Sequence, residues 1–126
     1  MALTNYLENA LLNATVRNTT YTSPATVYLA LYSVAPTAST AGTELSGSGY
    51  SRQAITFNAP SGGSVTSNVT VTFGPATGNW STINATAVVD ASTSGNIMYF
   101  TTTAAQNILS GSSLVIGGGN VSIVLT

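Results

Sequence analysis

The side chains of this chain that could do acid, base or ionic chemistry are few. The sequence contains neither cysteine nor histidine, and its charged residues are three acids and two arginines. Without cysteine there are no disulfides or thiol nucleophiles, and without histidine the commonest general base and transition-metal ligand are missing. Among the acids, only Glu44 and Asp90 could meet as a glycosidase pair, because Glu8 lies in a predicted helix. We therefore expect no enzymatic activity, no metal site and no cofactor.

Glu44 and Arg52 flank a glycine-rich turn in the most distinctive segment of the chain, residues 42–57. This segment has the sequence GTELSGSGYSRQAITF. The turn can fold back tightly enough to bring the two charges together, and a buried charge without a partner is costly. We predict that a structural latch, defined as Glu44, Gly47, Gly49, Tyr50 and Arg52, closes this loop within the chain. The alternative is that one or both charged residues reach a neighbouring subunit.

Aromatic side chains are the other candidates for ligand contact. Most of the six tyrosines fall on apolar faces of predicted strands, where packing in the core is the expected role. Trp80 instead follows Gly78 and Asn79 in a predicted turn. It is therefore the candidate residue for contact with a ligand such as a sugar.

The composition limits the kinds of partner that the chain can have. Charged residues make up 4% of the sequence and the formal net charge is −1, whereas about 25% is ordinary for a soluble domain. A nearly neutral surface favours association. We expect no nucleic-acid binding without a basic patch, and no membrane span without an apolar run of about 18 residues. The N-terminus lacks the basic and apolar regions of a secretory signal, so we expect synthesis in a cytoplasm.

One helix is predicted, over residues 4–17. Thr4 is a suitable N-cap, and Glu8 lies close enough to the start to favour the helix dipole. Leu3, Leu7 and Leu11 recur at a spacing of four residues and form an apolar stripe. This stripe either packs on the chain's own sheet or makes the segment a docking helix that contacts a neighbouring subunit.

The remainder, residues 25–126, predicts an antiparallel β-sandwich or jelly roll. Residues 26–34 are apolar on both faces, as expected of a central strand. Gly117 to Asn120 predicts a hairpin turn between the last two strands. The other strands are predicted from alternation and turn signals over residues 50–57, 64–73, 83–91, 97–103, 114–116 and 121–125. Residues 1–126 therefore predict a single, mainly β domain with one N-terminal helix.

Three segments resemble small virion proteins of tailed phages. They are residues 2–12, residues 22–32 and residues 42–57, and the most specific part is the sequence ELSGSGYSRQ at residues 44–53. Together with the generic C-terminal strands, the resemblance covers nearly the whole chain. Members of this group are labelled tail fibre or minor tail proteins and are similar to capsid decoration or cement proteins.

The resemblance implies a non-enzymatic virion component made in the host cytoplasm. Our leading expectation is a capsid cement protein that binds the major capsid protein and copies of itself, as a trimer at local three-fold axes. The alternative is a tail-associated adaptor or fibre module that binds tail proteins and recognises host glycans. A secreted sugar-binding module is a third class.

Overall fold

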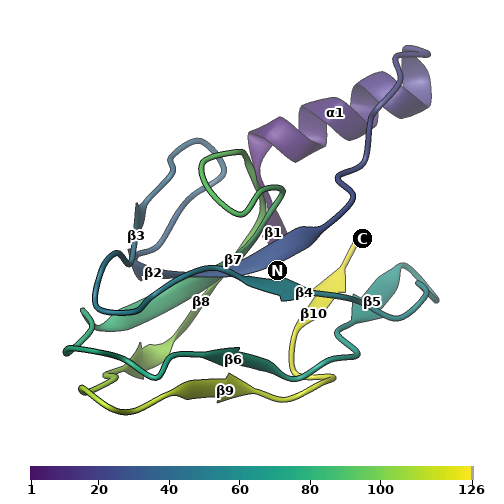
Figure 1. Cartoon of the computed structure of the whole chain (residues 1–126). Coiled ribbons are helices and arrows are strands. Elements are labelled where there is room, and N and C mark those ends of the chain that lie inside the picture. Colours follow the sequence, from purple (N-terminus) through teal and green to yellow (C-terminus); the bar gives the residue numbers. More distant parts are fainter. Residues whose placement is uncertain (126) are drawn as a thin grey trace.

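The computed structural model describes residues 1–125 and shows a β-sandwich with a single helix (Figure 1). The predicted fold class, mainly β with one N-terminal helix, is confirmed. Helix α1 spans Asn5–Val16. The strands are β1 (Ala2–Leu3), β2 (Val27–Val34), β3 (Thr43–Glu44), β4 (Gln53–Ile55), β5 (Ser64–Thr66), β6 (Val71–Phe73), β7 (Ile83–Val89), β8 (Ile97–Gln106), β9 (Leu114–Ile116) and β10 (Ser122–Val124).

The larger layer is an antiparallel sheet with the strand order β1-β8-β7-β2-β3. Strand β4 also pairs with β2, so β3 and β4 share one edge of that central strand. Opposite this edge, β2 pairs with β7 over Tyr28 to Tyr32. The prediction that residues 26–34 form a central strand is confirmed.

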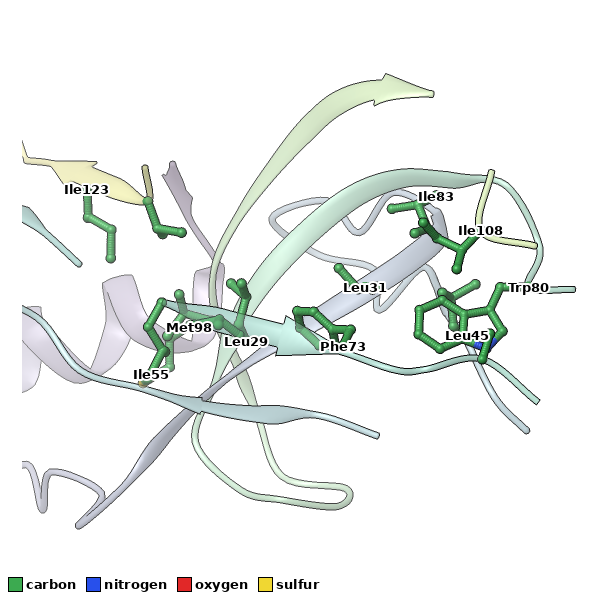
Figure 2. Close-up of a cluster of buried hydrophobic side chains, with 14 of the residues drawn as sticks. Leu29, Leu31, Leu45, Ile55, Phe73, Trp80, Ile83, Met98, Ile108 and Ile123 are labelled. Carbon is green, nitrogen blue, oxygen red and sulfur yellow. The ribbon is translucent and has the colours of Figure 1, made fainter. Parts of the chain in front are cut away.

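The second layer consists of two short ribbons, β6 with β9 and β5 with β10. Figure 1 shows the β6–β9 ribbon running beneath the large sheet. Phe73 from β6 and Ile123 from β10 join Leu29 and Leu31 from β2 in one buried cluster. Figure 2 shows this cluster extending between the layers from Ile123 at one end to Trp80 at the other. The sandwich core therefore lies between the large sheet and the ribbons.

The opposite face of the large sheet is also apolar, as the sequence of β2 predicts. Ala30 and Tyr32 from β2 and Ala85, Ala87 and Val89 from β7 form a second buried cluster. Apart from Tyr32, the members of this cluster are alanines and one valine. The loops that follow β2 and β7 approach this face (Figure 1).

Helix α1 begins where the sequence predicts, because Thr4 ties its first turn to the sheet. The Thr4 hydroxyl accepts a hydrogen bond from the Leu7 amide at 3.4 Å and donates one to the Ile97 carbonyl at 2.6 Å. Leu7 is buried against the main core. The far end of the helix projects from the sandwich (Figure 1), and Leu12 and Val16 are exposed.

The predicted strand over residues 64–73 is wrong in extent, because it is two strands with different partners. β5 pairs with β10, whereas β6 pairs with β9. At the bend between them, the buried Ser67 hydroxyl accepts hydrogen bonds from the Gly119 and Val121 amides at 3.1 and 3.2 Å. The alternating sequence pattern continues through this bend and therefore conceals it.

Two further strand predictions need correction. The last two strands, β9 and β10, do not pair as a hairpin, because each pairs with a strand of the 64–73 segment instead. The strand predicted over residues 50–57 is restricted to β4 and one bridge at Phe57. Tyr50 lies outside β4 and packs toward the main core.

Candidate functional site

The latch begins with a turn that needs glycine. Gly47, Ser48 and Gly49 have φ angles of +73°, +52° and +81°, a left-handed region that glycine enters without steric penalty. The Tyr50 amide closes the turn by donating to the Gly47 carbonyl at 3.0 Å. A Cβ atom at Gly49 would lie 3.1 Å from the Pro75 carbonyl oxygen. The two glycines therefore allow a tight turn and a close approach to the chain near Pro75.

This turn is fixed to the segment that carries Trp80. The Ser48 carbonyl accepts hydrogen bonds from the Thr77 amide at 2.9 Å and from the Trp80 indole N–H at 2.8 Å. The Tyr50 ring stacks on Phe73 with centroids 6.2 Å apart and meets Trp80 edge-on at 5.9 Å. Such aromatic pairs each add about 1 kcal/mol beyond the area they bury.

The Tyr50 hydroxyl joins this aromatic cluster to the large sheet. It donates to Glu44 Oε2 at 2.6 Å and accepts from the Leu31 amide at 3.1 Å. Leu31 lies in β2 between the residues that pair with β4 and those that pair with β3. The hydroxyl therefore satisfies a backbone amide where the two edge strands leave a gap.

Arg52 forms a bidentate ion pair with Glu44. Its Nε donates to Glu44 Oε2 and its Nη2 to Oε1, each at 2.9 Å. Its Nη1 donates to the Ala91 and Ser94 carbonyls at 2.8 and 2.7 Å. The side chains of Arg52 and Glu44 are 10% and 24% exposed. One guanidinium thus connects the edge of the large sheet to the loop between β7 and β8.

Hydrogen bonding sets the charge states of the latch. Burial opposes ionisation of Glu44, but hydrogen bonds from Arg52 and Tyr50 outweigh it and hold the pKa of Glu44 below its ordinary value. The hydrogen bond to Glu44 raises the pKa of Arg52 despite burial. Burial, reinforced by Glu44, raises the pKa of Tyr50 well above its ordinary value. At neutral pH the latch is one carboxylate, one guanidinium and one neutral phenol.

The structure places the five latch residues on one segment, from Glu44 in β3 to Arg52 just before β4, and pairs Glu44 with Arg52 inside the same chain. It also supplies partners that sequence reasoning did not identify, namely the carbonyls of Ser48, Ala91 and Ser94. Every residue has a backbone carbonyl, so residue types do not indicate which carbonyls will accept these hydrogen bonds. Only the folded structure identifies them. The stabilising role of the latch remains a prediction.

Trp80 does not have the exposed position that its predicted ligand role requires. It is 7% exposed, lies in the main core and uses its indole N–H within the chain (Figure 2). The turn that precedes it folds against Ser48 and buries the ring. The expectation of ligand contact at Trp80 is corrected for this reason.

The predicted docking stripe of α1 faces the chain's own sandwich. Leu7 is buried and Leu11 is half-buried, whereas Leu3 lies outside the helix, in β1, and is half-buried against the same core. Packing on the domain itself therefore accounts for the stripe. A docking contact of α1 would have to use other residues, such as the exposed Leu12 and Val16.

Within residues 1–125, no three His, Cys, Asp or Glu side chains lie close enough together to hold a metal ion. Among the same residues, no helix has the length and apolar character needed to cross a membrane.

The sequence matches one family model over almost its entire length. Residues 2–124 match the family described as Podophage GP4 fiber I protein gp80. The match includes α1, the latch and both layers of the sandwich. No curated protein matches the sequence.

Proposed function

The chain belongs to the family of the Podophage GP4 fiber I protein gp80, and we propose that it is a structural subunit of a phage tail fibre. It is thus a tailed-phage virion protein, as the sequence resemblance indicated. The observation that carries the proposal is the extent of the family match, which spans the whole sandwich. Tail proteins are its proposed partners.

A structural role agrees with how the chain uses its charged residues. Glu44 and Arg52 neutralise each other. Asp90 accepts hydrogen bonds from the Asn96 backbone amide and side-chain amide at 2.7 and 3.0 Å. These residues hold loops in place, and the lowered pKa of Glu44 makes it a poor general acid. We therefore propose that the chain is not an enzyme.

Self-association is part of the proposal. The low content of charged residues leaves little repulsion between copies, and a trimer is the proposed assembly. Light scattering coupled to size-exclusion chromatography would measure the mass of the purified protein in solution. A monomer at all accessible concentrations would contradict the proposed trimer. It would not bear on the proposal that the chain belongs to the tail fibre.

The copy number in purified virions tests the tail-fibre proposal. We expect quantitative mass spectrometry to give a ratio to the major capsid protein that matches known tail components in the same particles. The competing candidate is a capsid cement protein, bound across major capsid subunits. A ratio near that of the capsid protein, with antibody labelling over the head, would overturn the tail-fibre proposal in favour of cement.

A further inference from the structure

A groove of about 620 Å³ lies beside the latch, on the face of the large sheet that carries the second apolar cluster. It is lined by the first residues of α1, the 37–42 loop and the 94–97 loop, with Glu44 and Arg52 in its wall. In Figure 1 these two loops lie close to β3 and the start of α1. The Asn5 amide donates to the Ala38 carbonyl at 2.9 Å and joins the helix start to one loop. The volume of the groove is in the range of small-ligand sites.

The base of the groove contains a polar group without a partner. Tyr32 is 2% exposed, and its hydroxyl makes no hydrogen bond with any other residue of 1–125. Every fully enclosed side-chain nitrogen or oxygen in that range has a partner. The unpaired hydroxyl must therefore reach the groove that Tyr32 lines. Burial, helped by Glu44, raises the pKa of Tyr32 to about 12, so the hydroxyl remains a neutral donor and acceptor.

Further hydrogen-bonding capacity surrounds this hydroxyl. The Glu44 carboxylate accepts three hydrogen bonds, two on Oε2 and one on Oε1, and a carboxylate has about four acceptor sites. Within residues 1–125, the Asn5 side-chain amide makes no hydrogen bond, and the Asn96 side chain uses only its NH₂ group, which leaves its amide oxygen free. The groove therefore offers a hydroxyl, a carboxylate oxygen and two amides to a ligand.

An aromatic ring adds an apolar surface among these polar groups. Tyr6 lines the groove from the first turn of α1 and is 41% exposed. An exposed tyrosine presents a flat apolar face together with a polar tip. The C–H face of a sugar ring matches such a surface, while its hydroxyls match the neighbouring polar groups.

The charge of the groove restricts the ligand further. Its lining contains one carboxylate and one guanidinium, which are paired with each other. Four of the five N–H donors of the guanidinium are used, two toward Glu44 and two toward the backbone carbonyls of Ala91 and Ser94. The charged groups that line the groove within residues 1–125 therefore sum to zero, which favours a neutral ligand over a carboxylate or phosphate.

We propose that this groove is a binding site for a neutral saccharide, held by the Tyr32 hydroxyl, Glu44, Asn5 and Asn96 with the Tyr6 ring against one sugar face. The inference goes beyond the structural role and does not depend on the position of the chain in the virion. It also moves the expected sugar contact away from Trp80, which the core encloses.

Nuclear magnetic resonance titration of the full chain would test the site. The probes are glucose, galactose, mannose, N-acetylglucosamine and their common disaccharides, added to ¹⁵N-labelled protein. At least one should shift the amide signals of the 37–42 and 94–97 loops. Tyr32→Phe should weaken that binding about tenfold, the usual cost of one lost hydrogen bond in a polar site. Tyr28→Phe is the matched control, since Tyr28 packs on the same cluster outside the groove, and should bind normally.

A second pair of variants tests the aromatic surface. Tyr6→Ala should weaken binding about tenfold through loss of the ring face, whereas Leu12→Ala, an exposed apolar residue on the same helix, should leave it unchanged. The proposal is overturned if no probe shifts the loop signals. It is also overturned if binding maps elsewhere, or if Tyr32→Phe and Tyr6→Ala both bind as the unmodified chain does. None of these results would bear on copy number in the virion, so this inference and the tail-fibre proposal fail separately.

Discussion

Replacing Arg52 by alanine should destabilise the isolated chain strongly, because one side chain holds two parts of the fold together. The substitution removes two hydrogen bonds to Glu44 and two to the carbonyls of Ala91 and Ser94. Glu44 would keep its hydrogen bond from Tyr50 but lose its counter-ion. A charge left in this partly buried position is the main expected cost.

The size of the effect follows from the burial of the pair. Removing one partner of a buried ion pair costs about 3–5 kcal/mol, and the 24% exposure of Glu44 places this pair at the lower end. We expect a loss of about 3 kcal/mol in the free energy of unfolding. With the usual unfolding entropy per residue, this corresponds to about 11 °C in Tm for a chain of 126 residues.

The matched control is the chain's other arginine. Arg17 is exposed at the C-cap of α1, so Arg17→Ala changes the net charge equally and should shift the unfolding free energy by less than about 0.5 kcal/mol. Arg52→Lys should lie between the two, since lysine keeps the charge but cannot form the bidentate pair. Urea denaturation followed by circular dichroism gives all three values. If Arg52→Ala loses no more stability than Arg17→Ala, the latch does not stabilise the fold.

Two further predictions concern acid and the helix. Because the folded pKa of Glu44 lies below its ordinary value of 4.5, its stabilising contribution is complete above that value and is lost as the pH falls through the folded pKa. Denaturation curves below pH 4.5 should show this loss, and Glu44→Gln should make the curves less dependent on pH over that window; an unchanged dependence would contradict the assignment. In α1, Leu7→Ala should cost about 3 kcal/mol, because Leu7 is 3% exposed in the core. Leu12→Ala should cost less than about 0.5 kcal/mol at its exposed position, and equal losses for the two variants would show that the helix does not pack as described.

The sequence predicted the elements whose signals are local. The helix has a cap at Thr4 and a leucine every fourth residue, and both depend only on near neighbours. Strand β2 is apolar on both faces, and this alone marks a strand buried on two sides. The approach of Glu44 to Arg52 was also foreseeable, because they are only eight positions apart in the sequence and a glycine turn lies between them.

Pairings over long sequence distances could not be predicted in the same way. Gly117 to Asn120 has hairpin composition, but Ser67 holds this turn from more than fifty residues earlier in the chain, and the strands on either side join β6 and β5. The position of Trp80 depends likewise on the Ser48 carbonyl. In each case the decisive partner is a backbone group or a small hydroxyl, whose position is set only once the chain has folded.

The groove shares Glu44 and Arg52 with the latch, but the latch is expected to stabilise the fold and the groove to bind a saccharide. Different substitutions should therefore affect the two roles separately. Arg52 holds the 94–97 loop, and Asn5 is joined to Ala38, so both sides of the groove are positioned before any ligand arrives. Ordering the site in advance reduces the entropic cost of binding. Removing Arg52 should therefore reduce both stability and saccharide binding. Removing the Tyr32 hydroxyl should reduce binding alone, because that group makes no hydrogen bond with the rest of residues 1–125.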